Sequence, residues 1–113
     1  VLAIDSLKEA DMIIEQSAEL DPDSPEVHYL RGEICFLQDQ MSAALDHFRA
    51  AEDRTESGKV YSAFGQVFSQ IDILAQRGLC LQRLGNVEGA RSIGEKIVAG
   101  SPDHPVGRAL SNL

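Results

Sequence analysis

Tryptophan is absent from the sequence, cysteine occurs twice, and aromatic residues make up only 5% of its 113 residues. Two cysteines cannot form the disulfide framework that holds a small secreted scaffold together. No apolar run approaches the length needed to cross a bilayer. The sequence also lacks glycine-rich phosphate loops, CxxC pairs and His-x-x-x-His helical pairs. These absences exclude a disulfide scaffold and argue against nucleotide and zinc sites.

The remaining nucleophiles and bases do not combine into a catalytic pattern. Cys35 and Cys80 both fall in the middle of predicted helices, on faces expected to pack, so we interpret them as small buried hydrophobic residues. His28, His47 and His104 belong to three different predicted elements, and none is spaced as a metal ligand of its neighbour. We therefore expect no catalytic residue, no metal, no cofactor and no enzyme activity.

Basic residues are scarce as well. The chain has ten Lys and Arg residues and eighteen Asp and Glu residues, which gives a net charge of −8. Residues 1–24 hold one Lys and seven acids, whereas residues 59–113 hold six bases and four acids. A protein that binds nucleic acids or anionic membranes needs a strongly basic face, so we exclude both as partners. An acidic chain is better suited to a protein or peptide with basic residues and apolar anchors.

The length of 113 residues leaves room for one domain, and 43% hydrophobic with 25% charged residues is typical of globular proteins. The sequence begins at Val1 rather than at a methionine, so we expect a fragment of a larger protein. The sequence does not identify the cellular compartment of the protein, although the cytoplasm is favoured.

The most informative pattern is an internal repeat. Ala10, Ala44 and Ala90 follow one another at intervals of 34 and 46 residues, and the proline-rich segment at 21–25 returns 80 residues later at 101–105. All of these spacings fit a unit of 34 residues with an insertion of 12 residues before the third unit. Regular periods of this length are typical of repeat proteins that stack into a solenoid.

The period and the small residues at these offsets resemble the tetratricopeptide repeat family, whose unit is a helix–turn–helix pair. The family's motif positions are matched by Gly32, Ala44, Phe48 and Ala51 in one unit and by Gly78, Gly85, Ala90 and Pro102 in the next. In the second of these units Gly94 stands where the family has an aromatic ring, so we expect closer packing or a notch there.

The resemblance implies an all-α fold, a right-handed superhelix of about two and a half units within a single domain, 1–113. Its parts are a partial unit at 1–24, full units at 25–58 and 71–104, an insertion at 59–70 and a terminal helix at 105–113. Local signals predict helices at about 7–20, 25–38, 41–54 and 87–99. Ser24 with Pro25 and Asn86 are predicted to cap helix starts, and Gly85 to end a helix.

The insertion is open to two interpretations. Apolar residues at helical spacing run unbroken from residue 60 into the next unit, which favours a first helix extended back to Lys59. The alternative is a loop at 59–70 that folds back and buries its aromatic rings within the chain. An extended helix would carry an exposed apolar ridge and could pair two copies as a homodimer. The ridge residues are Val60, Phe64, Val67, Phe68 and Ile71.

In the family the first helices of successive units line a concave groove that binds a partner. By resemblance, the groove residues here are Glu26, Tyr29, Glu33, Phe36, Asp72, Leu79, Gln82 and Arg83. Some members clamp a chaperone's C-terminal carboxylate with basic residues on these faces, but the matching positions here include Glu33 and Asp72. An acidic groove repels a carboxylate, so that sub-function is not expected.

The leading functional hypothesis is a non-catalytic module that binds a peptide or protein in this groove. One alternative is the accessory repeat region of a transferase, of the sulfotransferase or glycosyltransferase type. Another is a small chaperone of the secretion type. These residues do not identify the partner.

Overall fold

The computed structural model describes residues 12, 21, 23–63 and 66–113. The helix expected at about 7–20 therefore lies almost wholly outside the described residues. The described elements, in chain order, are α2 (Pro25–Leu37), α3 (Met41–Asp53), β1 (Val60–Ala63), β2 (Gln66–Ser69), α4 (Gln70–Arg83), α5 (Val87–Gly100) and α6 (Pro105–Ser111). The described part of the chain is thus mostly helical, in agreement with the predicted all-α class, apart from one small sheet.

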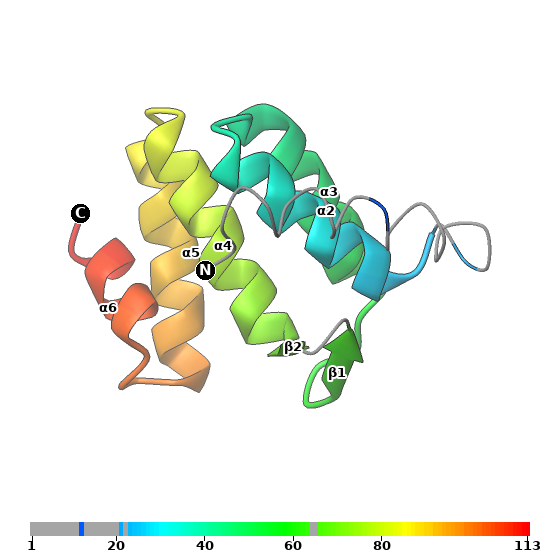
Figure 1. Ribbon diagram of the computed structural model, residues 1–113. Helices are drawn as coiled ribbons and strands as arrows, with labels where there is room; N and C mark the ends of the chain where they lie inside the picture. Colours follow the sequence, from blue (N-terminus) through cyan, green and yellow to red (C-terminus); the bar gives the residue numbers. More distant parts are fainter. Residues whose placement is uncertain (1–11, 13–20, 22, 64–65) are drawn as a thin grey trace.

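The helices form a row in which each one packs against the next along the chain. Figure 1 shows α2 and α3 at one end of the row, α4 and α5 in the middle and α6 at the other end. Short turns at 38–40 and 84–86 reverse the chain, so α2–α3 and α4–α5 are two helical hairpins. The bounds of α2, α3 and α5 match the predicted helices within about two residues.

The predicted helix starts are confirmed by their caps. The Ser24 hydroxyl accepts a hydrogen bond from the Val27 amide at 3.2 Å, with Pro25 at the first helical position. The Asn86 side chain accepts one from the Gly89 amide at 2.9 Å. Gly85, just after α4, has a φ of +86°, a left-handed conformation that glycine adopts without strain. Local sequence signals therefore set these boundaries.

The predicted extension of the helix back to Lys59 is wrong. Val60–Ala63 and Gln66–Ser69 pair as antiparallel strands, referred to below as the hairpin, with Tyr61 opposite Phe68, and α4 begins only at Gln70. Each strand contains a valine directly followed by an aromatic residue, and both residue types favour strands. The hairpin also places the Phe68 ring against Tyr29 of α2 and leaves Phe68 1% exposed. The folded-back alternative thus describes this segment better, because the ring gains a core that a projecting helix would lack.

Close approaches by glycine fix how the helices pack. Phe48 of α3 is fully buried, and a Cβ at position 32 of α2 would lie 2.7 Å from its ring. In the second helical hairpin the ring is missing, and α6 packs directly on Gly94 instead. A Cβ at position 94 would lie 2.7 Å from the Cβ of Leu110 and would overlap the backbone nitrogen of Ser111. Of the two outcomes expected at Gly94, closer packing or a notch, the structure has the closer packing.

Candidate partner-binding surface

The predicted groove residues belong to α2 and α4, and one ring stack joins α2 to the hairpin that precedes α4. Tyr29 stacks on Phe68 with ring centroids 4.1 Å apart and planes within 7° of each other. The Glu33 carboxylate lies close enough to the Tyr29 hydroxyl to interact with it. Burial raises the pKa of Tyr29 far above its usual range, and the nearby carboxylates of Glu33 and Asp72 raise it further. Tyr29 therefore stays neutral and serves as part of the core.

A second contact joins the C-terminal ends of the same two helices. The Arg83 guanidinium lies over the Phe36 ring, 4.7 Å from its centroid. Such a cation–π contact is worth about 0.5–1 kcal/mol at an exposed site. Phe36 and Leu79 are half-buried apolar residues packed against the core, and Gln82 is exposed. The structure therefore brings α2 next to β2 at one end and next to the last residue of α4 at the other, with apolar side chains partly open to solvent.

Carboxylates border this surface, and one of them also caps a helix. Glu26 and Glu33 are half-buried on α2. Asp72 accepts hydrogen bonds through its Oδ2 from the Ser69 amide at 2.8 Å and from the Ser69 hydroxyl at 3.2 Å. These bonds fix the start of α4. Asp72 thus contributes negative charge to the surface, while its Oδ2 already accepts the hydrogen bonds that cap α4.

An open pocket lies at the edge of this surface, beside the turn between α2 and α3. Its volume is about 570 Å³, and Arg83 is the predicted groove residue in its lining. The other lining residues are Asp39, Gln40, Met41, Ser42, Ala43 and Leu84. Because the remaining groove residues lie outside this lining, the pocket is an extension of the predicted groove and not its centre.

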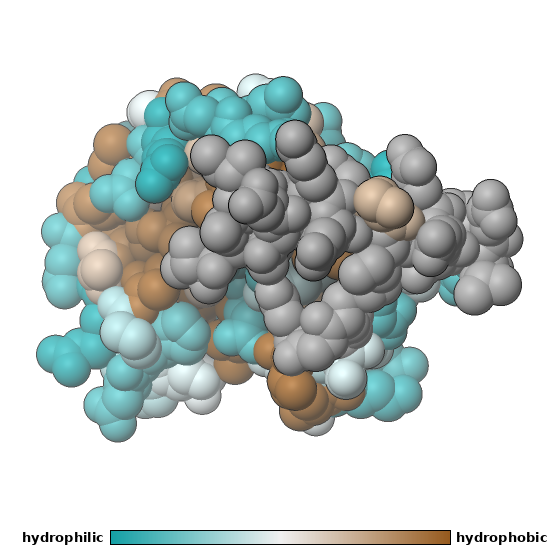
Figure 2. Space-filling view, in the orientation of Figure 1, coloured by the Kyte–Doolittle hydropathy of each residue, from teal (hydrophilic) through white to brown (hydrophobic). Residues whose placement is uncertain are grey.

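The residues of the predicted dimer ridge do not form one surface. Val60 and Val67 are each 69% exposed on the outer side of the hairpin, whereas Phe68 points into the core. Ile71 is half-buried at the start of α4, and Phe64 falls outside the described residues. Figure 2 shows apolar surface at the hairpin, below the helices. Of the four ridge residues that the structure describes, only Val60 and Val67 are exposed.

One buried ion pair holds the two helical hairpins together. Arg77 of α4 donates to both carboxylate oxygens of Glu52 on α3, at 2.6 and 2.9 Å. Both side chains are about four-fifths buried. A pair in this environment is sensitive to the loss of either partner, because the remaining charge would be left uncompensated. The relative position of α3 and α4 is therefore set by this contact as well as by apolar packing.

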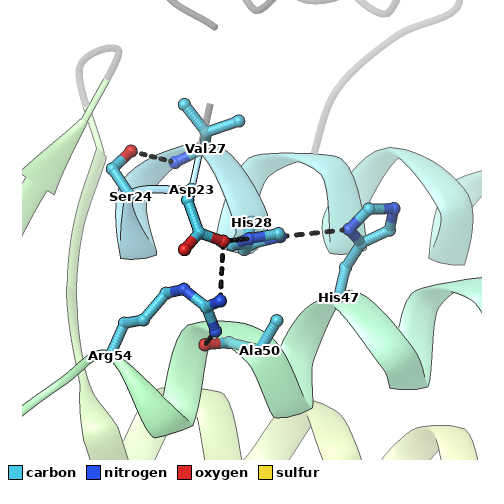
Figure 3. A network of polar contacts seen from close by, with 7 residues as sticks. All are labelled: Asp23, Ser24, Val27, His28, His47, Ala50 and Arg54. Carbon is cyan, nitrogen blue, oxygen red and sulfur yellow. Dashed lines mark hydrogen bonds and ion pairs between the residues drawn. The ribbon is translucent and has the colours of Figure 1, made fainter. Parts of the chain in front are cut away.

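A polar network that the sequence did not indicate connects the start of α2 to α3 (Figure 3). His28 Nε2 lies 3.0 Å from Asp23 Oδ1, and His28 Nδ1 lies 3.4 Å from His47 Nδ1. Arg54, just after α3, forms an ion pair with Asp23 at 2.6 Å and donates to the Ala50 carbonyl oxygen at 2.9 Å. The network thus fastens both ends of the same helical hairpin to each other.

The network shifts the protonation of two of its members. Hydrogen bonds from His28 and then Arg54 lower the pKa of Asp23 below its usual value. Burial lowers the pKa of His47, as do the positive charges of His28 and Arg31, while Asp46 opposes them. Asp23 is therefore ionised over a wider pH range, and His47 resists protonation.

The sequence could have indicated this pair. The two histidines do lie on different helices, but the turn at 38–40 makes those helices antiparallel neighbours. Residues at similar distances from such a turn fall on facing helical turns. A search for titratable residues related by the turn, in place of spacing along one helix, would have found His28 and His47.

The buried thiol of Cys80 is not activated. Burial raises the pKa of Cys80 to about 11, so its thiol is protonated at neutral pH and a weak nucleophile. Cys35 is half-buried, and neither cysteine is in a disulfide. Among the residues that the structure describes, no three His, Cys, Asp or Glu side chains gather where they could hold a metal ion.

The described helices are too short or too polar to cross a membrane. No protein-family model matches the chain. A search of curated proteins finds no match either.

Proposed function

We propose that this chain is a non-catalytic protein-interaction module of the tetratricopeptide type, a right-handed stack of about two and a half units. The observation that carries the proposal is the arrangement of α2 and α4, which are the first helices of two successive helical hairpins. Phe36 and Arg83 join the C-terminal ends of the two helices, and the stack of Tyr29 on Phe68 joins α2 to β2, directly before α4. Between these contacts lie half-buried apolar and acidic side chains that a bound segment could cover.

The proposed ligand is an extended or helical peptide with apolar anchors and at least one Lys or Arg. Phe36 and Leu79 supply partly exposed apolar area. Glu26, Glu33 and Asp72 supply negative charge. The cation on this surface, Arg83, already lies over an aromatic ring. Opposite charge at such a rim chiefly raises the association rate and makes binding sensitive to salt.

A pair of labelled peptides tests this proposal. One has alternating Leu and Lys, the other alternating Leu and Glu, and fluorescence anisotropy measures their binding to the whole chain. We expect the Lys peptide to bind and the Glu peptide not to bind. Glu33→Gln keeps a polar side chain beside Tyr29 but removes one charge, and it should weaken binding of the Lys peptide about threefold to fivefold.

The matched control is Glu95→Gln on α5, where the carboxylate is exposed. This variant makes the same change of charge away from α2 and α4, so binding should stay within about twofold of the wild type. Equal losses for the two variants would show a general effect of net charge and would contradict a site on α2. Stronger binding of the Glu peptide would contradict the proposal as a whole.

We retain self-association as a separate proposal, with the outer face of the hairpin as its contact. Val60 and Val67 are exposed there, and no charged residue lies between Lys59 and Asp72. Two acidic chains can meet at an uncharged face with less repulsion than elsewhere. We expect Val60→Ser with Val67→Ser to lower the mass measured by sedimentation at high concentration. A wild-type chain that sediments as a monomer at high micromolar concentration would contradict this.

A further inference from the structure

The contact between His28 and His47 lies at a junction that the proposed binding surface does not use. It joins α2 to α3, and both rings are half-buried. The ring centroids are 5.6 Å apart, and the planes are tilted by 34°. Asp23 and Arg54 extend the network at the start of α2 and the end of α3. Ionisable groups therefore bridge the two helices where a change of charge acts directly on their contact.

The hydrogen-bonding partners fix the number of protons in this contact. The carboxylate of Asp23 only accepts, so the proton between Asp23 and His28 belongs to His28 Nε2. When His28 is neutral, its Nδ1 has no proton and must accept a hydrogen bond from His47 Nδ1. When His28 is charged, its Nδ1 donates and His47 Nδ1 accepts. In either state one proton lies between the two Nδ1 atoms.

We propose that His28 and His47 form a pH-sensitive latch between α2 and α3, which holds while one proton is shared between their Nδ1 atoms and opens when both rings are fully protonated. With two protons the rings have two donors and no acceptor facing each other. The hydrogen bond is then lost, and two positive charges lie side by side. Arg31 of α2 adds to the repulsion of His47, and Asp46 on α3 offsets part of it. On the far side of His28, Asp23 is already paired with Arg54.

The direction of the pH effect follows from the environment of His47. Its pKa in the folded chain lies below the ordinary value of 6.5, so the unfolded chain binds the proton more readily. The contribution of the contact is therefore complete above about pH 6.5 and is lost progressively as the pH falls below that value. The latch opens on acidification, in the range where histidine serves as a switch.

A double-mutant cycle measured at two pH values tests the latch. His28→Ala, His47→Ala and the double variant are unfolded with urea at about pH 7.5 and about pH 5, and the coupling between the two sites is calculated. At the higher pH we expect the coupling to raise the equilibrium constant for folding roughly threefold. We expect it to change sign at the lower pH. Effects of carboxylates elsewhere cancel in the cycle.

The matched control is the cycle between His28 and His104, because His104 caps α6 at the other end of the row. That pair should show no coupling at either pH. A His28–His47 coupling that keeps its sign, or that equals the control, would overturn the proposal. A second measurement needs no variant: imidazole nitrogen NMR of the wild type should show His28 with its proton on Nε2 at about pH 7.5. A neutral His28 ring with its proton on Nδ1 and none on Nε2 would overturn the proposal independently.

Discussion

Replacing Phe68 with alanine is expected to lower the free energy of unfolding by about 3–5 kcal/mol, the usual cost of removing a buried aromatic ring. Phe68 is 1% exposed and lies between two other rings. It stacks on Tyr29 at 4.1 Å and on Tyr61 at 5.6 Å. Its loss leaves a cavity between the hairpin and α2, so the hairpin should separate from the helices. Urea unfolding followed by circular dichroism measures the effect.

The neighbouring residue is the control for this prediction. Val67 is 69% exposed on the opposite side of β2, so Val67→Ala should change the stability by no more than about 0.5 kcal/mol. This contrast depends on the alternation of a strand. A projecting helix would leave both side chains without a core, and both variants would then have small effects. Similar values for the two variants would contradict the hairpin as described.

Helix boundaries could be predicted from the sequence because their causes are local. The cap at Ser24 acts on Val27, and the cap at Asn86 acts on Gly89, each three residues along the chain. A turn made by Gly85 needs no distant partner. A local window of residues therefore contains the physical reason for each of these ends, and the structure agrees with all of them.

The hairpin could not be predicted in this way because its stabilising partner is distant in sequence. Residues 60–71 place apolar side chains at intervals that satisfy a helix and, at alternate positions, a strand. Burial of Phe68 against Tyr29 decides between the two, and those residues are 39 positions apart. Tertiary packing thus overrode an ambiguous local pattern.

The same limit applies to the candidate sites. Repeat positions predict that residues of α2 and α4 share a surface, since a stack of repeats would place equivalent positions side by side. They did not indicate that Tyr29 would be covered by the hairpin or that Asp72 would be used as a cap. The histidine pair depends on two helices approaching each other. Spacing along one element contains no information about that approach.

The departure of Gly94 from the repeat pattern has an explanation in α6. In the first helical hairpin Phe48 fills the space beside Gly32. In the second, the equivalent glycine, Gly78, contacts Leu110 of α6, which is 1% exposed. Gly94 is what allows α6 to come close enough for Leu110 to occupy that space. The terminal helix α6 therefore supplies the apolar side chain that the second helical hairpin, α4–α5, lacks.

This arrangement predicts that Gly94→Ala destabilises the chain, although alanine is the better helix former. Helix propensity alone would stabilise α5 by about 1 kcal/mol. The added methyl group, however, would overlap the backbone of α6 at Ser111, and backbone cannot move aside as the end of a flexible side chain can. Overpacking of this kind costs about 1–3 kcal/mol, so we expect a net loss of stability and the release of α6.

Gly100→Ala provides the matched control in the same helix, because a Cβ at position 100 would have no heavy atom within 4 Å. Only propensity acts there, and the stability should stay unchanged or rise by up to about 1 kcal/mol. Urea unfolding measures both variants, and amide hydrogen exchange in residues 105–111 reports whether α6 has been released. If Gly94→Ala stabilises the chain as much as Gly100→Ala does, α6 does not pack on α5 as closely as described. If exchange in α6 is unchanged while stability falls, the strain is absorbed within α5, and Leu110 keeps its place beside Gly78.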